Sequence, residues 1–303
     1  MSASATESVI HDIGYRRYDG PRLRRAAIVR ALAWHSFRSA FGFGRSAKAK
    51  VVPVLALALL SLPAVINAVS VSQGNQRTIG YDTYIVGLRI VVMLIFVAVQ
   101  APELVSRDLR NRVLPLYFSR PLRPVDYPFA KYVAFTAACL VMIEVPVLVL
   151  YVGTIVSLHG GSAVWAETRA LIPGLLVGLM WAVVMAAISL ALASLTGRRA
   201  FATGAIAIFF CLTEILAVVV LHAETRGDPA ALTHASTAVK VAGLFSPVTL
   251  FDGVRRWLGG TGGDQALVPD PGSFGVIYVV VLLALLAASL LGLAARYRKA
   301  ALS

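Results

Sequence analysis

Charged residues are scarce in this sequence, and those of negative sign are the scarcest. Only 14% of the 303 residues are Asp, Glu, Lys or Arg, whereas 58% are hydrophobic and the mean hydropathy is +0.78. A water-soluble domain with this balance would lack the polar side chains needed to cover its core. The composition therefore argues against an ordinary soluble protein and predicts a polytopic membrane protein.

Motifs of common catalytic and metal-binding chemistry are also absent. There is no GxxxxGK[ST] phosphate loop, and the nearest stretch, GFGRSAKAK at 42–50, lacks the second glycine before a Lys-Ser or Lys-Thr pair. No HExxH, CxxC or GxSxG occurs, and the spacing of His159, His222 and His234 matches no metal-ligand motif. The chain is therefore expected to carry no catalytic residue, no metal and no cofactor of its own, so energy for any work must come from elsewhere.

Cysteine is nearly absent, and the first residues lack an apolar core. Cys139 and Cys211 both fall inside apolar runs, so we expect small buried side chains rather than a disulfide. Residues 1–50 are polar and basic without a short apolar stretch, so no cleavable leader is expected there.

Long apolar runs are the dominant feature that is present. A helix needs about 20 apolar residues to cross the roughly 30 Å of hydrocarbon in a bilayer. Strands of membrane barrels instead alternate in polarity over about ten residues, and these runs do not alternate. The sequence predicts an all-α polytopic membrane protein with six transmembrane helices, at residues 51–71, 84–105, 132–158, 170–196, 200–222 and 274–295.

Positive charge is distributed unevenly among the segments that connect these runs. Lys and Arg near span ends are retained in the cytoplasm, so their distribution predicts orientation. They gather in residues 1–50, in the connection 106–131, in the turn at Arg198 and Arg199, and in the tail. Both termini are therefore expected on the cytoplasmic side of the cell (plasma or inner) membrane. The connections on the other side carry only Arg77, Arg169, Arg226, Lys240, Arg255 and Arg256.

The net charge of +13 does not indicate a nucleic-acid surface. Because the cations follow the expected topology, they are better explained as an orientation signal with added affinity for anionic membrane lipids. No nucleic-acid partner is expected.

A basic, proline-rich stretch separates the second and third expected spans. Residues 102–132 read PELVSRDLRNRVLPLYFSRPLRPVDYPFAKY. An acidic-basic cluster around Asp108 is followed by a short apolar helix, a Ser-Arg-Pro turn at 119–121, and Lys131 at the opening of the next span. This order resembles the coupling element in transmembrane subunits of type-2 ABC exporters, although Arg-Val-Leu-Pro at 112–115 replaces the usual Gly-Thr-Leu-Glu.

The resemblance extends over most of the chain and implies a non-catalytic permease subunit. A basic N-terminal helix, six spans and an outer segment containing LFSPVTLFDGVRRW at 244–257 occur in the family's order. The family implies two separately encoded ATP-binding subunits that hold ATP and Mg²⁺, and a second permease subunit in a homo- or heterodimer. The substrate would be amphipathic or hydrophobic. Contact with the ATPase would fall on Asp108, Arg110, Arg112, Leu114, Tyr117, Phe118, Arg120 and Pro121.

The residue types in this stretch suit such a contact on physical grounds as well. Proline fixes φ and restricts the residue before it, so a short helix between prolines is stiff. Leu114, Tyr117 and Phe118 offer apolar and aromatic anchors, and the flanking arginines favour an acidic partner. The alternative is an ordinary basic connection whose prolines merely end helices.

Residues 24–43 predict a helix that lies along the inner membrane surface. One helical line carries Val29, Ala33, Phe37 and Phe41. Basic residues lie mostly opposite, although Arg30 intrudes on the apolar side and Leu32 falls outside it. The resemblance implies that this helix touches the ATPase and steadies the first span, and a plain lipid-surface helix is the alternative. The residues expected to matter are Val29, Trp34, Phe37 and Phe41.

Within the expected spans, the ionisable residues Arg89, Glu144 and Glu214 are candidates for a polar role. Each is costly in hydrocarbon, so each should face protein or water. Their depths allow a pair or a triad, which would be either an interhelical salt bridge or a polar lining of the translocation path. An ion-coupled secondary transporter that uses these residues is the alternative function, and a membrane-embedded lipid-modifying enzyme is a further one.

The expected organisation has three parts. Residues 1–50 form a cytoplasmic segment with the amphipathic helix, 51–296 the six-span domain, and 297–303 a cytoplasmic tail. The six-span domain includes the cytoplasmic coupling helix in 106–131 and an outer segment at 223–273. Within that outer segment, residues 236–257 are too polar to cross the membrane and too apolar to form a loop in water. This predicts short re-entrant or interfacial helices. The stretch GGTGGDQALVPDPGS after it is expected to be a loop.

Overall fold

The computed structural model describes residues 20, 24–111, 117, 122–225, 237–259, 268 and 270–302. Over these residues the regular structure is helical, and six helices are long and apolar enough to cross a membrane. The expected all-α fold with six spans is confirmed. The spans are α2 (Lys48–Ser72), α3 (Leu88–Arg110), α5 (Asp126–Val156), α6 (Gly161–Ser194), α7 (Arg199–Thr225) and α10 (Gly275–Leu302).

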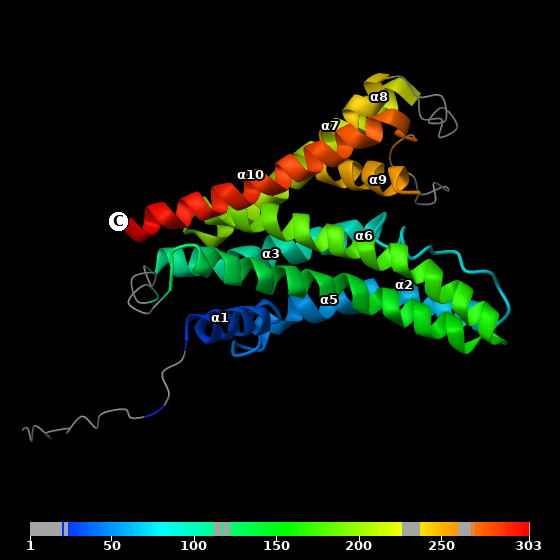
Figure 1. Ribbon diagram of the computed structural model, residues 1–303, viewed down its shortest axis with the longest axis horizontal. Helices are drawn as coiled ribbons and strands as arrows, with labels where there is room; N and C mark the ends of the chain where they lie inside the picture. The colour runs from blue at the N-terminus through cyan, green and yellow to red at the C-terminus, as the bar shows by residue number, and fades with distance from the viewer. Residues whose placement is uncertain are drawn as a thin grey trace, which may run out of the picture.

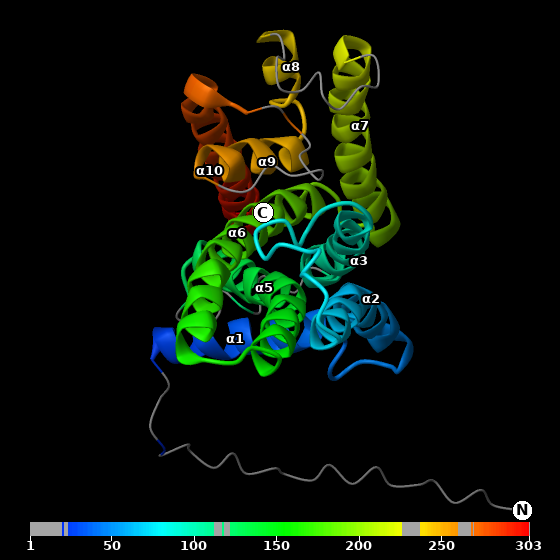
Figure 2. The same cartoon turned by 90° about the vertical axis from the view of Figure 1, so that its right-hand side faces the viewer.

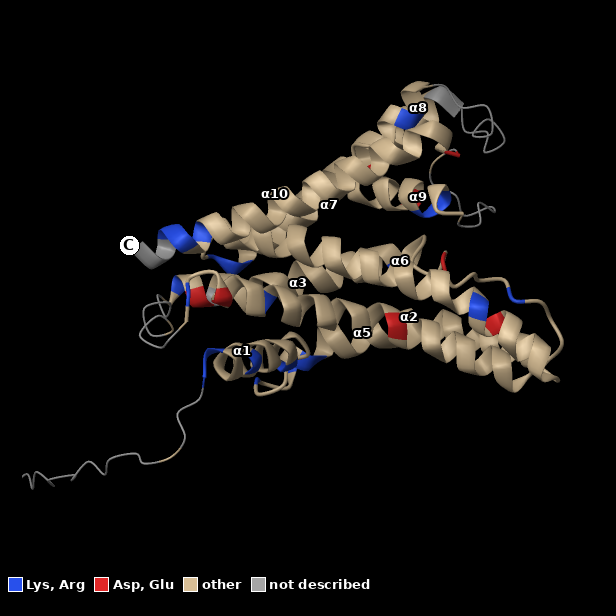
Figure 3. Cartoon of the chain, in the orientation of Figure 1, with Lys and Arg blue, Asp and Glu red and all other residues tan. Residues whose placement is uncertain are grey.

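The bundle has two unlike ends. At one end lie α1 (Arg25–Ala40), the connection from α3 to α5, the turn from α6 to α7, and the C-terminal end of α10 (Figure 1). Lys and Arg gather there in Figure 3, so we call it the basic end. At the opposite end lie the connection from α2 to α3, the turn from α5 to α6, α8 (Thr237–Ala242), α9 (Pro247–Trp257) and the 3₁₀ turn η3 (Gly272–Phe274). Figure 2, viewed along the spans, shows α1 running crosswise to them.

Several helices begin away from the edges of the apolar runs. The second span begins at Leu88 rather than near Tyr84, because Gly87 has a φ of 66°, a left-handed conformation that interrupts a helix. By contrast, α5 and α6 begin earlier than expected, at Asp126 and Gly161. An apolar run marks only the part of a helix that needs hydrocarbon, whereas the helix itself continues into the polar layer.

The protein core lies where α3, α5 and α6 meet. Phe96 and Phe135 stack there with ring centroids 6.1 Å apart, and both are fully buried. Cys139 is fully buried in this core, as expected, whereas Cys211 on α7 is exposed and was wrongly expected to be buried. Apolar character alone does not separate a residue that faces protein from one that faces lipid.

Large apolar side chains cover the outer faces of α2, α7 and α10. Ile66, Ile208 and Leu291 are 60%, 65% and 70% exposed. In water such faces would be unstable, but in a bilayer they lie against lipid tails or another apolar chain. The exposed faces therefore agree with the six-span architecture.

The two short helices expected in the outer segment are present as α8 and α9. The second begins where Ser246 accepts a hydrogen bond from the amide nitrogen of Val248 at 3.1 Å, with Pro247 at the first helical position. A hydroxyl at the N-cap and a proline just inside are both favourable at a helix start. In Figure 1, α7 and α10 lean away from the other spans toward the opposite end, and α9 lies beside them.

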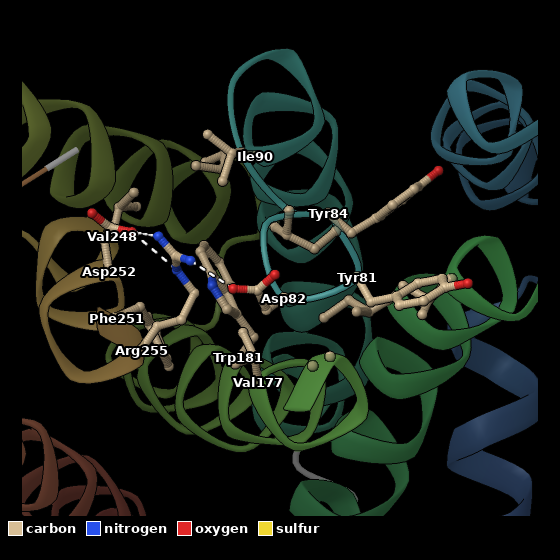
Figure 4. A pocket seen from close by; sticks show the side chains of 16 residues that line it. Tyr81, Asp82, Tyr84, Ile90, Val177, Trp181, Val248, Phe251, Asp252 and Arg255 are labelled. Atoms are coloured by element: carbon tan, nitrogen blue, oxygen red, sulfur yellow. Dashed lines mark hydrogen bonds and ion pairs between the residues drawn. The ribbon is translucent and has the colours of Figure 1, made fainter. Parts of the chain in front are cut away.

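A buried ion cluster fastens α9 to the connection between α2 and α3. Arg255 is 4% exposed, and its nitrogens lie 2.8 Å from Asp82 Oδ2 and 2.6 Å from Asp252 Oδ1 (Figure 4). Asp252 also accepts a hydrogen bond from the amide nitrogen of Val268 at 3.0 Å. Trp181 of α6 stacks on Phe251 of α9 with centroids 4.7 Å apart. The guanidinium thus neutralises two carboxylates that are themselves withdrawn from water.

The connection that carries Asp82 is fixed on its other side as well. Tyr81 donates to Glu167 of α6 at 2.6 Å, and Arg77 pairs with the same carboxylate. Burial, reinforced by the hydrogen bond to Glu167, raises the pKa of Tyr81 to about 12, so its hydroxyl remains a donor at neutral pH. Tyr84 donates to the carbonyl of Leu60 in α2 at 2.6 Å. The connection between α2 and α3 is therefore fixed to α2, α6 and α9.

We predict that Arg255→Met lowers the free energy of unfolding by about 3–5 kcal/mol, because buried Asp252 and the 14% exposed Asp82 lose their shared cation. Thermal unfolding of the purified chain in mild detergent measures the loss. Arg169→Met is the matched control, since Arg169 is exposed and its guanidinium lies only over the Trp165 ring.

The triple variant Arg255→Met, Asp82→Asn, Asp252→Asn should recover most of the lost stability, because no unpaired carboxylate is then left. Equal melting temperatures for wild type and Arg255→Met would contradict the role assigned to this ion cluster.

Candidate functional site

The candidate site is the base of the connection between α3 and α5, at the basic end. The end of α3 at Arg110 and the start of α5 at Asp126 are its two flanks. Of the residues expected to contact an ATPase, the structure describes Asp108, Arg110 and Tyr117. The others lie outside the described residues: Arg112, Leu114, Phe118, Arg120 and Pro121.

Asp108 joins the two flanks directly. Its Oδ2 lies 3.0 Å from Lys131 Nζ of α5 and also accepts a hydrogen bond from the Tyr127 hydroxyl. The Lys131 side chain is 7% exposed, and Tyr127 is fully buried. A charge-assisted contact at low exposure is stronger than a surface ion pair, because water competes for it poorly. The end of α3 is thereby fixed against the first turns of α5.

Three tyrosine rings extend this contact to α10. The Tyr127 ring lies 5.1 Å from the Tyr117 ring and 5.1 Å from the Tyr297 ring, measured between centroids. Tyr117 is helical and half-buried, and packs against the core. It was expected to form part of an apolar knob facing a partner, but at least one face of its ring is turned to the bundle. Tyr117 therefore anchors the connection inward.

Arg110 differs from its neighbours in facing water. It is exposed at the end of α3, and its backbone lies close to Gly197 in the turn between α6 and α7. An exposed arginine at the edge of a fixed base remains free to meet an acidic surface.

Asp126 fixes the amphipathic helix α1 to the start of α5. It accepts a hydrogen bond from Arg25 Nε at 2.6 Å and a second from the same guanidinium, and its Oδ2 accepts one from the Arg123 amide nitrogen at 2.8 Å. The two bonds from one guanidinium set orientation as well as distance. They also raise the pKa of Arg25 above its ordinary value.

The buried line of α1 is not the one expected from the sequence. Leu32, Ser36 and Ala40 are buried, whereas Val29, Phe37 and Phe41 are half-buried at its edge. Trp34 is 62% exposed and stacks on Phe37 with centroids 5.7 Å apart. Leu32 was placed outside the apolar side, which was wrong. The helix packs against α5 and α3, and the small side chains of Ser36 and Ala40 permit close approach there.

Glu103 joins two further segments to α3. Its side chain is 6% exposed, its Oε2 lies 2.6 Å from a nitrogen of Arg45, and its Oε1 pairs with Arg199. Arg45 lies between α1 and α2, and Arg199 is the first residue of α7. A buried carboxylate is stable only when it is paired, so these contacts tie both segments to α3. We call Glu103, Asp108 and Asp126, with their cations, the carboxylate clamps.

The end of α6 is held by hydrogen bonds to its last carbonyls. Ser106 Oγ donates to the Ala193 carbonyl at 2.9 Å, and Arg296 Nε donates to the Ser194 carbonyl at 3.2 Å. The last carbonyls of a helix have no partner within the helix, and a cation there is also favoured by the helix dipole. Spans α3, α6 and α10 therefore meet at the same level as the clamps.

Sequence reasoning missed Glu103, although it falls inside the expected span 84–105. It is the acidic residue between Pro102 and Leu104, so its polarity within an apolar run was a readable signal. Arg25 and Asp126 are 101 positions apart, and nothing in the local pattern links them. Tyr127 reads as an interfacial aromatic and gives no sign of its contact with Asp108.

The three intramembrane residues expected to form a pair or triad lie in separate environments. Arg89 Nε donates to the Tyr84 carbonyl, and its guanidinium lies 5.1 Å from that ring's centroid. Glu214 accepts from Ser246 at 2.6 Å. Glu144 packs against Gly178 of α6, and neither of its oxygens has a hydrogen-bond partner in the described part of the chain. The structure contains no ion pair among these three. Across the described ranges, no group of three or more His, Cys, Asp or Glu side chains could hold a metal ion.

Comparison with known proteins identifies a family. The family described as ABC-2 family transporter protein matches residues 45–296, which include all six spans in large part and the whole connection from α3 to α5. A search of curated proteins found no match to the sequence.

Asp126→Asn is predicted to loosen α1 selectively, because a neutral amide cannot replace the charge-assisted pair with Arg25. We expect hydrogen exchange of the backbone amides at 25–40 to accelerate by up to about tenfold. The partial exposure of Arg25 keeps the effect at or below this size. Exchange measured by mass spectrometry in detergent gives the result.

Arg30→Gln provides the control, since Arg30 is an exposed cation on the same helix. The clamp assignment fails if exchange in α1 is unchanged by Asp126→Asn, or if Arg30→Gln accelerates it equally.

Proposed function

The chain belongs to the ABC-2 family of transporter proteins, and from this premise we propose that it is the permease subunit of an exporter driven by ATP hydrolysis in a partner chain. Its cargo would be an amphipathic or hydrophobic molecule that moves from the cytoplasm or the inner leaflet to the outside. Members of this family are transmembrane components of transporters, and they generally work with an ATP-binding partner subunit.

The observation that carries this proposal is the clamped base of the connection between α3 and α5. A segment that transmits force must not bend where it joins the spans. Asp108 links α3 to α5, Glu103 links α3 to α7, and Asp126 links α5 to α1. A push on residues 111–125 would therefore displace several spans together instead of being absorbed locally.

The proposed cycle begins when ATP draws two partner subunits together beneath two permease chains. Their movement would push the connection between α3 and α5, and the clamps would pass that movement to α3, α5 and α7. At the opposite end, the contacts of Arg255 with Asp82 and Asp252 would then separate to open the outward path. This last step follows from the proposed direction of transport.

The distribution of charge supports a cytoplasmic basic end. The N-terminal helix, the α3–α5 connection, the α6–α7 turn and the end of α10 carry cations at one end of the bundle (Figure 3). Lys and Arg near span ends are retained on the cytoplasmic side. An ATP-binding partner would be found on that side, where nucleotide is available.

The exposed apolar faces support both lipid contact and a second permease chain. In the most apolar stretch of α2, and likewise of α7, only 22% of the residues are buried within one chain. In α10 the share is 17%. We propose a dimer, homomeric or heteromeric, that covers part of this surface and is served by two ATP-binding subunits.

The ion-coupled carrier has less support. Coupling through Arg89, Glu144 and Glu214 would need these groups to communicate, and each contacts a different part of the chain. Family membership likewise favours a transporter powered by a nucleotide-binding partner.

The first test of the proposal is co-purification with an ATPase. In mild detergent the tagged wild-type chain should bring down an ATP-binding subunit with measurable ATPase activity. Leu114→Asp combined with Phe118→Asp should reduce that activity at least about tenfold, because charge replaces two apolar anchors. Tyr117 is left intact, since its contact with Tyr127 belongs to the fold.

Leu258→Asp is the matched control for this experiment. Leu258 is 69% exposed and lies at the opposite end, so the same chemical change there should leave the ATPase bound. Retention of full ATPase activity by the double variant would overturn the assigned contact, and absence of any ATPase from the wild-type eluate would count against the exporter.

The orientation is tested separately by cysteine labelling in intact cells. In a Cys211→Ser background, Leu258→Cys should react with a membrane-impermeant maleimide, whereas Lys299→Cys should react only after lysis. The reverse pattern would place the basic end outside and rule out a cytoplasmic ATPase contact there.

A further inference from the structure

An open pocket of about 430 Å³ lies between α3 and α7. Its walls are apolar: Ile90, Ile95 and Ala98 come from α3, Phe210 and Ile215 from α7, and Val248 from α9. Toward the basic end, the two helices are joined by the pair of Glu103 with Arg199. The pocket is thus a space between two spans that are fixed together at one end and lie beside α9 at the other.

Glu214 is the only acidic or basic side chain among the residues that line this pocket. Ser246 Oγ donates to its Oε2 at 2.6 Å, while the same hydroxyl accepts from the Val248 amide nitrogen at 3.1 Å. The carboxylate is therefore held by the first turn of α9. Within the described part of the chain, Oε1 of Glu214 makes no hydrogen bond.

Among the residues that the structure describes, none forms an ion pair with Glu214. Arg89, which is close in sequence to the pocket wall, is engaged by the carbonyl and ring of Tyr84. A carboxylate among apolar walls within a span is costly, and the cost falls when a cation or a donor meets it. The pocket's chemistry is therefore complementary to a molecule with one positively charged group and an apolar body.

The depth of Glu214 distinguishes a free amphipath from a resident lipid. It lies near the middle of α7, and at 1.5 Å per residue it is more than about 15 Å along the helix from either end. A lipid amine that stays in the headgroup layer does not reach this depth. A smaller amphipathic molecule that enters the apolar space does.

We propose that the α3–α7 pocket binds amphipathic amines, with the ammonium group at Glu214 and the apolar part against Ile90, Ile95 and Phe210. Glu214 selects for the positive charge, and Ser246 positions Glu214. That such a molecule is carried across the membrane rests on the proposed function; that it binds here does not.

The chain contains its own probe for this pocket. Cys211 lines the pocket and is exposed and free, whereas Cys139 is fully buried. The rate at which an apolar maleimide labels Cys211 can be followed on the purified chain in nanodiscs, without nucleotide or partner. Dodecylamine and dodecanol serve as matched ligands, since they share an apolar chain and differ in charge.

Dodecylamine should protect Cys211 at concentrations at least about tenfold lower than dodecanol, the ratio expected for about 1.4 kcal/mol of added interaction. Glu214→Gln should abolish this advantage, because an amide still accepts from Ser246 but does not attract a cation. Glu214→Asp should retain part of the difference between dodecylamine and dodecanol. It serves as the control that separates loss of the charge from a general effect of substitution at this position. Glu144→Gln, a change to a carboxyl group outside the pocket, should behave as wild type.

Equal protection by the two ligands in the wild type would overturn the proposal, as would an amine advantage that persists in Glu214→Gln. The outcome is independent of the exporter hypothesis. Amine-selective protection without any ATP-driven transport would support the amine site and refute the exporter function. ATP-driven transport without amine-selective protection would support the exporter function and refute the amine site.

Discussion

A carboxylate withdrawn from water is stabilised by a nearby cation, and the basic end of this protein provides such cations repeatedly. Glu103 holds Arg45 and Arg199, Asp108 holds Lys131, and Asp126 holds Arg25. Each pair joins segments that are distant in sequence. Because breaking such a pair leaves an unpaired charge, removal of either partner is costly. The relative positions of α1, α3, α5 and α7 depend on them.

α3 is the element through which the two ends communicate. It carries Asp108 and Glu103 near its C-terminal end, forms a wall of the α3–α7 pocket with its N-terminal half, and follows the connection whose Asp82 contacts Arg255. A displacement of its basic end therefore has a direct mechanical route to both the pocket and the outer ion cluster. In the proposed exporter, this route converts a push by the ATPase into a change in access to the pocket.

The sequence predicted the spans and short outer helices well, because apolar length and polarity are local properties. It failed where the answer depended on which face of a helix meets protein. Leu32 is buried and Cys211 is exposed, contrary to expectation, since both lie in apolar surroundings that look alike in one dimension. The clamps were missed for a related reason: Arg25 and Asp126, or Arg45 and Glu103, become partners only after the helices have packed. Conversely, ionisable residues are rare within the spans, which suggested that Arg89, Glu144 and Glu214 pair with one another. In the folded chain each lies in a separate environment.

The stiffness of the clamped base is tested most directly by comparing transport with ATP hydrolysis in the reconstituted complex. Asp108→Asn removes the charge that joins α3 to Lys131 while leaving the ATPase subunits and the rest of the connection unchanged. If the clamps transmit force, the variant should still hydrolyse ATP but move at least about tenfold less substrate for each ATP consumed, the factor expected for about 1.4 kcal/mol of lost coupling. An unchanged ratio of substrate moved to ATP hydrolysed would contradict the mechanism.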